Sequence, residues 1–320
     1  MRTGYITGAK GKIALSKIVL GTSYYGTGIN QKDAYALLDK YYLCGGRTLD
    51  TARIYGINEA GFSASELTIG EWMSLRGVRS EITLISKGGH PPFGKMDQSR
   101  LDRESLHSDC NASLRDLGTD YIDLYFLHRD DERLPVGPIM DALHELVEAG
   151  KVRALGASNW RIERILQANA YAKANGKTPF SISQIQWSLA HCTPEAVGDP
   201  TLVCMDDAEY SKYLEAGLPV MAFASQAKGL FSKYIAGGEA ALNEKIRQRF
   251  LTEENLHRID RVQRLSERTG YSPAAITLSY ITCNAVDGYA IVGCSNVDQL
   301  MDSLSADLLD LDPDTLLKYD

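Results

Sequence analysis

Short apolar runs rich in β-branched residues recur along the chain, and segments with helical spacing of apolar residues lie between them. The runs are four to eight residues long, which is typical of buried strands. We therefore expect eight strands. They cover residues 17–21, 47–50, 82–87, 121–128, 152–158, 181–186, 219–224 and 290–293.

Three of the intervening segments predict helices most clearly. In residues 102–117, 138–149 and 161–175, apolar side chains recur at the spacing that places them on one helical face. Gly118 follows the first of these segments, at the position where a glycine commonly ends a helix in a left-handed conformation. Strands and helices thus alternate along the chain.

Repeated strand–helix units imply parallel strands with crossover helices, and eight such units close most naturally as a (β/α)8 barrel. No Pro-, Gly- or Ser-rich linker divides the chain, so we expect a single-domain α/β TIM barrel over residues 1–320. Residues 4–15, with GAKGK between two apolar runs, predict a β-hairpin before the first barrel strand. Residues 237–251 predict a polar, mobile insertion near the active-site end.

The composition narrows the class of protein. With 320 residues, 44% of them apolar, the chain can bury a large core. A net charge of -7 with mixed signs argues against a nucleic-acid partner. No apolar stretch approaches the roughly 18 residues of a membrane span, and the N-terminus lacks the apolar region of a signal peptide. Six cysteines without a CxxC pair indicate free thiols, so we expect a cytoplasmic protein.

Four polar side chains lie where three successive predicted strands end. Asp50 closes RTLD, with Tyr55 five residues later, while Lys87 closes ITLISK and His128 closes YIDLYFLH. The carboxyl ends of barrel strands meet at one mouth, so these groups would converge. A phenol with a pKa near ~10 is a weak acid, and an adjacent ammonium lowers that pKa. We expect Tyr55 to donate a proton to a carbonyl, with Lys87 and Asp50 tuning it. His128 would donate to the same oxygen or assist the transfer.

Further polar side chains at strand ends predict a nicotinamide cofactor as the reductant. Ser158 and Asn159 end the fifth predicted strand, and Gln184 lies on the sixth. Two amides and a hydroxyl that face one mouth can hydrogen-bond a carboxamide. Phe223 ends the seventh strand and offers an aromatic face on which a nicotinamide ring can stack.

At this point the chain resembles the aldo-keto reductases over nearly its whole length. The resemblance rests on RTLDTARIYG (47–56), SKGG (86–89), DLYFLHR (123–129), GKVRALGASNW (150–160) and SQIQWS (183–188). It implies a catalytic tetrad, NADP(H) or NAD(H) bound without a Rossmann fold, and interconversion of an aldehyde or ketone with its alcohol. The tetrad is Asp50, Tyr55, Lys87 and His128. The implied cofactor contacts are Gly21, Thr22, Asp50, Ser158, Asn159, Gln184, Phe223, Ala224, Ser225, Gln226, Gly229, Gly293, Cys294, Gln299 and Ser303.

Residues 292–303 depart from the family pattern. Many members that use NADPH place Lys or Arg here around the 2′-phosphate, whereas this chain has Gly293 and Gln299 at those positions. The segment contains two aspartates and no basic residue, and a guanidinium is the natural partner of a phosphate. The family default of NADPH is therefore weakened. Either NADH is used, or a residue such as Lys228 or Lys233 compensates.

The substrate is less defined than the chemistry. The candidates for substrate contact are Tyr24, His90, Arg129, Trp160 and Trp187. They suit a polar ring such as a sugar and an aromatic aldehyde equally, and packing beneath loops is the alternative for each. We expect no metal, because no His and Cys spacing matches a zinc site. A nucleotide-binding redox-sensing partner with negligible turnover is the alternative function, and the direction of reaction and the oligomeric state stay open.

Overall fold

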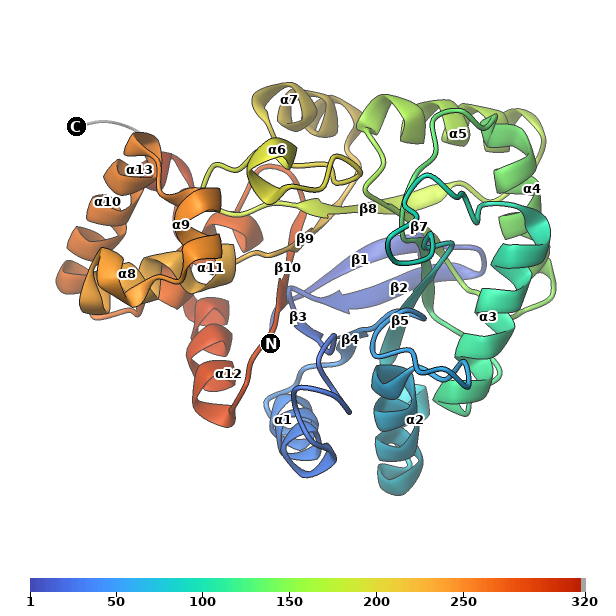
Figure 1. The fold of residues 1–320 in the computed structure, drawn as a ribbon, viewed down its shortest axis with the longest axis horizontal. Coiled ribbons are helices and arrows are strands. Elements are labelled where there is room, and N and C mark those ends of the chain that lie inside the picture. Colours follow the sequence, from blue (N-terminus) through green and yellow to red (C-terminus); the bar gives the residue numbers. More distant parts are fainter. Residues whose placement is uncertain (318–320) are drawn as a thin grey trace.

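A computed structural model describes residues 1–317 and shows a closed barrel of parallel strands surrounded by helices (Figure 1). The strand order is β10-β3-β4-β5-β6-β7-β8-β9, and every neighbouring pair is parallel. The predicted TIM barrel is thereby confirmed. Its strands are β3 (Ile18–Gly21), β4 (Thr48–Asp50), β5 (Thr83–Gly88), β6 (Leu124–Leu127), β7 (Leu155–Ser158), β8 (Phe180–Gln186), β9 (Val220–Phe223) and β10 (Gly288–Val292).

Helices cross the outside of the barrel between successive strands. In the first five crossovers these are α1 (Gln31–Leu43), α2 (Ala64–Arg76), α3 (Arg103–Leu117), α4 (Val136–Glu148) and α5 (Ile162–Ala174), with the 3-10 turn η1 (Arg79–Glu81) before β5. The three helices predicted at 102–117, 138–149 and 161–175 are therefore confirmed. Gly118 ends α3 with φ 61°, as its position predicted.

The chain after β8 contains more helices, and those after β9 and β10 gather on one side of the barrel in Figure 1. Those after β8 are α6 (Pro194–Val197) and α7 (Asp207–Ala216). Those after β9 are η2 (Ala227–Gly229), α8 (Leu230–Gly237), η3 (Glu239–Ala241), α9 (Glu244–Phe250), α10 (Glu253–Thr269) and α11 (Pro273–Thr282). Those after β10 are α12 (Val297–Leu304), η4 (Ser305–Leu308) and α13 (Asp314–Leu317). In the described part of the chain, no helix is both long and apolar enough to cross a membrane.

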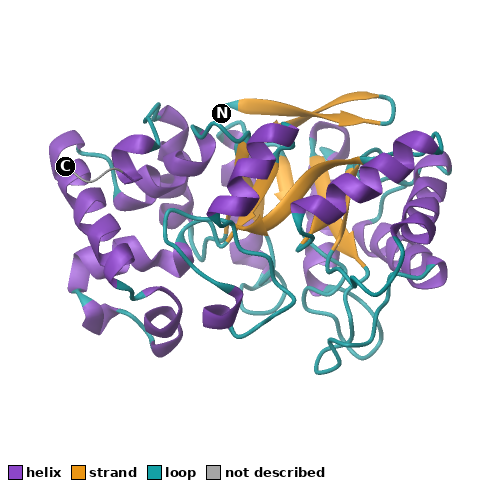
Figure 2. Cartoon of the chain, turned by 90° about the horizontal axis from the view of Figure 1, so that it is seen from above, coloured by secondary structure: helices purple, strands orange, loops and turns teal. Residues whose placement is uncertain are grey.

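The predicted hairpin is confirmed as β1 (Thr3–Gly8) and β2 (Gly11–Ser16). It covers one end of the barrel, while long loops emerge from the other end (Figure 2). Ile6 and Leu15 of the hairpin are buried in one cluster with side chains from inside the barrel, including Val19, Ile85 and Phe126. The hairpin thus closes the amino-terminal end of the barrel with apolar side chains.

The predicted insertion at residues 237–251 is a packed part of the structure. It forms η3 and α9, and Leu242, Ile246 and Phe250 are buried. α9 contacts η2 and α6, so the insertion lies beside the segment that leaves β9, as expected. Most residues of the segment are polar and exposed as expected, but every fourth residue from 242 to 250 turns an apolar side chain inward. Mobility of the segment stays a prediction.

Candidate active site

Buried Asp50 and Lys87 form a hydrogen-bonded chain with half-buried Tyr55 at the carboxyl ends of β4 and β5. The Lys87 Nζ donates to Asp50 Oδ2 at 2.7 Å and to the carbonyl oxygen of Thr51 at 2.8 Å. It also lies 3.4 Å from the Tyr55 hydroxyl. The Lys87 side chain has no exposed surface, and a charge that is buried so fully requires paired and hydrogen-bonded partners. Three of the predicted tetrad residues are therefore in direct contact.

Burial and neighbouring charges shift the pKa values of Lys87 and Tyr55 in opposite directions. Burial lowers the pKa of Lys87, but Asp50 and Tyr55 outweigh it and hold that pKa above its ordinary value. Burial raises the pKa of the Tyr55 phenol, and Lys87 offsets only part of the increase. The expectation that Lys87 lowers the phenol pKa holds for that single interaction, but the net shift is upward. At neutral pH the pair is therefore a protonated phenol beside an ammonium.

His128 follows β6, and its ring packs against the ring of Tyr55. Its ring lies 5.8 Å from the Tyr55 ring and 4.9 Å from the His90 ring, both in edge-on contact. Burial, Lys87 and Arg129 together hold the pKa of His128 well below its ordinary value. The imidazole is therefore neutral, and within the described chain its buried Nδ1 has no hydrogen-bond partner. A neutral imidazole can donate one N–H to a substrate oxygen without a net charge.

The predicted carboxamide-binding residues lie on the neighbouring strands. Gln184 Nε2 donates to Asp50 Oδ1 at 2.9 Å, which joins β8 to β4 across the barrel. Asn159 has a left-handed φ of 59°, and its Nδ2 donates to Ser158 Oγ at 3.1 Å and to the carbonyl oxygen of His128 at 3.3 Å. Asparagine is among the few non-glycine residues that adopt this conformation readily, because its short polar side chain can hydrogen-bond locally. The structure thus brings these three polar groups to the mouth.

The segment that leaves β9 is strained. Ala224, Ala227 and Lys228 have φ of 50°, 47° and 58°, a region that favours glycine. Gln226 Nε2 donates to Ser303 Oγ at 3.2 Å, so this segment is tied to α12 beyond the end of β10. Such strain persists where the surrounding structure fixes it, and it clusters at ligand clamps. The predicted cofactor contacts on these two segments therefore lie side by side.

The remaining predicted cofactor contacts surround this pair of segments. Thr22 Oγ1 donates to the carbonyl oxygen of Asp50 at 2.9 Å, and Ser225 Oγ donates to the carbonyl oxygen of Ile291 at 2.5 Å. Gly293 faces open space, because a Cβ added there would meet no atom within 4 Å. The other residues of this set are Gly21 at the end of β3, Phe223 at the end of β9, Gly229 with φ 81°, buried Cys294, and Gln299 on α12.

These observations test whether a nicotinamide nucleotide fits the mouth. Amide and hydroxyl groups match a carboxamide, a half-buried aromatic side chain stands at Phe223, and open space surrounds Gly293. Lys228 and Lys233 lie together, since Lys233 Nζ donates to the carbonyl oxygen of Lys228 at 2.9 Å. The chemistry of the donor set fits such a nucleotide. Among the described residues, no group of three or more His, Cys, Asp and Glu side chains could hold a metal ion.

A cavity of about 490 Å³ lies among the loops that follow β5, β6, β7 and β8. Arg129, Asn159 and Val203 contribute to its lining. Arg129 is held by Thr201 Oγ1 at 3.1 Å and by Asp199 Oδ2 at 3.4 Å. The cavity is polar, and its lining residues Arg129 and Asn159 directly follow His128 and Ser158 in the chain.

Two predicted substrate residues, Tyr24 and His90, lie on loops at the carboxyl ends of the strands and are at least partly exposed. Tyr24 is 62% exposed, and His90 is half-buried with its Nδ1–H donating to the carbonyl oxygen of Pro91 at 2.6 Å. Phe93, 70% exposed, lies against the His90 ring at 5.4 Å. An aromatic surface thus borders the site on this side.

The two tryptophans predicted as substrate contacts are both buried. Trp160 is fully buried against Phe180, with its Nε1 donating to the carbonyl oxygen of Arg129 at 3.2 Å. Trp187 is 3% exposed and packs against Tyr210 of α7 and Tyr280 of α11. Burial of both rings favours the alternative of packing beneath the loops, and their contact with a substrate stays a prediction.

The sequence analysis missed a buried ion cluster behind Tyr55, formed by Arg53, Glu66 and Asp116. The one signal for it is the capping-box spacing of Ser63 and Glu66. In that motif the glutamate bonds back to the backbone N–H of the cap. Here the N–H of Ser63 donates instead to Asp116 at 2.8 Å, and Glu66 turns toward the barrel.

Comparisons with known proteins define the class as an oxidoreductase. A norsolorinic acid reductase of Emericella nidulans is 30% identical over 93% of this chain and 76% of its own length. A putative aryl-alcohol dehydrogenase of Saccharomyces cerevisiae is 28% identical over 95% of this chain and 82% of its own. An uncharacterized oxidoreductase of Bacillus subtilis is 28% identical over 95% and 91%. The sequence model of the aldo/keto reductase family matches residues 17–319. The chain belongs to the aldo/keto reductase family, which supports carbonyl–alcohol oxidoreduction.

Proposed function

We propose that the protein is an NAD(P)(H)-dependent carbonyl reductase or alcohol dehydrogenase, with Asp50, Tyr55, Lys87 and His128 as its catalytic tetrad. The observation that carries the proposal is the buried contact of Lys87 with both Asp50 and the Tyr55 hydroxyl. A structural lysine has little reason to be fully desolvated next to a phenol. A general acid that must release its proton as a charge develops needs this kind of neighbour.

The raised pKa of Tyr55 supports its role as the proton donor in reduction, because the phenol stays protonated at neutral pH. When it is bound, the nicotinamide nucleotide supplies the hydride for the carbonyl carbon. Tyr55 gives its proton to the carbonyl oxygen, and the Lys87 ammonium stabilises the phenolate that remains. Neutral His128 orients the carbonyl through its N–H. Solvent then returns a proton to the phenolate, and alcohol oxidation uses the same groups in reverse.

The phosphate state of the nucleotide is the second part of the proposal. Residues 292–303 carry no basic side chain, whereas Lys228 and Lys233 lie together on the neighbouring segment. We infer that discrimination between NADPH and NADH depends on these two lysines. Fluorescence titration with both nucleotides in parallel tests this. If the lysines hold the 2′-phosphate, a double Lys228→Ala/Lys233→Ala variant weakens NADPH more than NADH.

Aromatic carbonyls are the substrate class that we propose to assay first. Two relatives bear the names norsolorinic acid reductase and aryl-alcohol dehydrogenase, and exposed Tyr24 and Phe93 border the mouth. A sugar carbonyl is the second panel. The six cysteines are free thiols, which supports the proposed cytoplasmic location.

Replacing Tyr55 with Phe tests the mechanism. The variant keeps the ring but lacks the proton donor, so kcat should fall by about 10²–10⁴-fold. Nucleotide affinity should remain within about twofold, because the phenol hydroxyl is not among the proposed cofactor contacts. Steady-state turnover and fluorescence titration of the same preparation measure both quantities. Near-normal kcat would overturn the mechanism, and negligible turnover of the wild type over both substrate panels would favour the redox-sensing alternative.

A further inference from the structure

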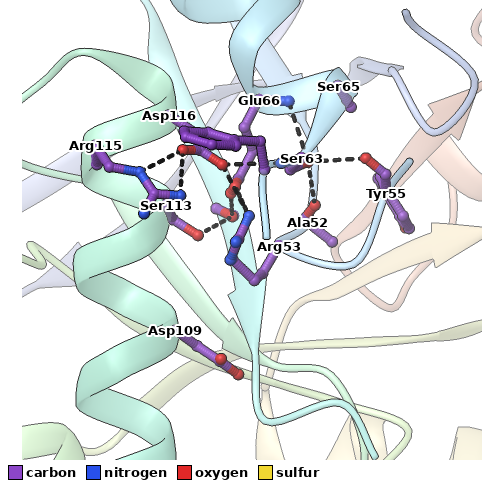
Figure 3. Close-up of polar contacts among 12 residues, drawn as sticks. Ala52, Arg53, Tyr55, Ser63, Ser65, Glu66, Asp109, Ser113, Arg115 and Asp116 are labelled. Carbon is purple, nitrogen blue, oxygen red and sulfur yellow. Dashed lines mark hydrogen bonds and ion pairs between the residues drawn. The ribbon is translucent and has the colours of Figure 1, made fainter. Parts of the chain in front are cut away.

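Three ionisable side chains lie buried behind the loop that carries Tyr55 (Figure 3). Arg53 comes from the start of this loop, Glu66 from α2 and Asp116 from α3. Arg53 Nη1 lies 2.9 Å from Asp116 Oδ2 and 3.5 Å from Glu66 Oε2. The side chains of Glu66 and Asp116 have no exposed surface. The three residues form what we call the anchor cluster.

The anchor cluster holds the Tyr55 loop at several points. Asp116 Oδ2 accepts a hydrogen bond from the backbone N–H of Ser63 at 2.8 Å, and the Arg53 guanidinium donates to the carbonyl oxygen of Gly61. Ser63 Oγ in turn donates to the carbonyl oxygen of Tyr55 at 2.8 Å, as Figure 3 shows. The backbone of Tyr55 is therefore fixed by Ser63, and Ser63 is fixed by Asp116.

The same cluster contacts the strand that carries Lys87. Ser86 Oγ, on β5, donates to Glu66 Oε1 at 2.6 Å. The backbone N–H of Arg53 donates to the carbonyl oxygen of Lys87 at 3.0 Å. The cluster thus bridges the Tyr55 loop and β5. It joins the two segments whose separation sets the 3.4 Å distance between the Tyr55 hydroxyl and Lys87 Nζ.

Stability alone is a weak explanation for such a cluster. Replacing a buried ion cluster by well-packed apolar side chains is often neutral or stabilising, because each charge is costly to desolvate. Glu66 shows that cost, since its Oε2 accepts no hydrogen bond from any described residue. Ionic and hydrogen-bonding contacts do fix direction and distance more narrowly than apolar contacts.

We propose that Arg53, Glu66 and Asp116 are positioning residues that hold the Tyr55 hydroxyl against the Lys87 ammonium. The proposal rests on the proposed function of Tyr55 as the proton donor. A displacement of about 1 Å at a reacting group can cost about 10²-fold in rate. Loosening the anchor cluster should therefore lower kcat while the nucleotide, held by other segments, still binds.

A second aspartate in the same barrel provides a matched control. Asp123 is buried, contacts Arg79 Nη2 at 3.0 Å and Arg153 Nη1 at 2.9 Å, and accepts from the backbone N–H of Leu84 at 3.0 Å. Asp116 likewise contacts two arginines and accepts from one backbone N–H. Asp123 precedes β6, at the end of the barrel opposite the tetrad. The two sites thus differ in location more than in chemistry.

The experiment compares Asp116→Asn with Asp123→Asn in the full chain. Asp116→Asn should lower kcat about tenfold or more, which corresponds to about 1.4 kcal/mol, with nucleotide affinity within about twofold. Asp123→Asn should leave kcat within about twofold. In alcohol oxidation, the rising limb of the pH–kcat profile should move to higher pH in Asp116→Asn, because the phenol loses part of its contact with Lys87. A variant that is only less stable would keep the wild-type profile.

Equal kcat values for the two variants, or a fall in kcat without a shift in the pH profile, would overturn the positioning role. Arg53→Lys, which keeps the charge but loses the fork that reaches Gly61, replaces Asp116→Asn if that variant does not fold. The Tyr55→Phe variant separates the two proposals. Normal turnover in Tyr55→Phe overturns the proposed function itself. Loss of turnover there, together with normal kcat in Asp116→Asn, overturns the positioning role alone.

Discussion

Different kinds of side chain close the interior of the barrel at its two ends. At the amino-terminal end, Ile6 and Leu15 of the hairpin close the interior with apolar contacts. At the carboxyl-terminal end, Asp50 and Lys87 are buried as an ion pair, with Arg53 and its carboxylate partners behind them. Apolar burial at the amino-terminal end stabilises the fold, whereas desolvation of the charged groups at the carboxyl-terminal end is unfavourable. Stability and chemistry are therefore separated along the barrel axis.

Among the substitutions that test this difference between the two ends, Lys87→Met should have the largest effect on kcat. The variant leaves the phenolate without its ammonium, so kcat should fall by about 10²–10⁴-fold. Lys17 is the matched control. It precedes β3 at the amino-terminal end of the barrel and forms an ion pair with Asp287. Lys17→Met should keep kcat within about twofold. Equal losses in steady-state kcat for the two lysines would show that the ends are not functionally distinct.

Shortening the buried Leu15 side chain of the hairpin should lower stability and leave turnover unchanged. Leu15 has no exposed surface, and Leu15→Ala should lower the free energy of unfolding by about 2–5 kcal/mol through lost burial and a cavity. Turnover by the folded fraction should not change. Tyr5 on the same hairpin is 58% exposed, and Tyr5→Ala should change stability by less than about 1 kcal/mol. Denaturant unfolding measures the stability of each variant, and steady-state assays measure its kcat. A large loss of kcat in Leu15→Ala would contradict the separation of stability from chemistry along the barrel axis.

A smaller, pH-dependent effect is expected at Glu66. Burial raises the pKa of Glu66 to about 7, against the opposing effect of Ser113, Ser86 and Arg53. The folded protein therefore keeps a proton on Glu66 that the unfolded chain releases near pH ~4.3. Stability therefore falls as the pH rises from about 4.3 to about 7, and the full cost of the buried carboxylate remains above pH 7.

Glu66→Gln removes that dependence. The difference in unfolding free energy, variant minus wild type, should become more positive from pH 5 to pH 8, by on the order of 1–3 kcal/mol. Denaturant unfolding at both values measures it. Asp123→Asn serves as the reference at the opposite end of the barrel. A flat difference for Glu66→Gln across this range would show that the carboxyl titrates normally.

The fold could be predicted well from the sequence, because strands, crossover helices and caps are local patterns. All eight barrel strands, the hairpin and the Gly118 cap lie where the periodicity and turn residues place them. The insertion at 237–251 was predicted less well, because its apolar residues are few and polar residues separate them. The assignment of residues 1–320 to a single domain stays a prediction.

The candidate site was predictable only in part. Residues at strand ends converge by barrel geometry, so the contact of Asp50 with Lys87 follows from the fold. The net pKa shift of Tyr55 did not follow, because it depends on how fully the loops desolvate the phenol. Burial of Trp160 and the inward turn of Glu66 likewise depend on tertiary packing, and no spacing in the sequence encodes either.

The hydrogen bond from Gln184 to Asp50 also has a consequence for how the chain matures. Its partners are 134 residues apart and lie on β8 and β4, which are not neighbours in the barrel. A nascent or refolding chain can form its first strand–helix units early, yet it cannot complete this span until β8 is in place. Enzymatic activity should therefore return after most of the helical signal during refolding, as a late reporter of ring closure.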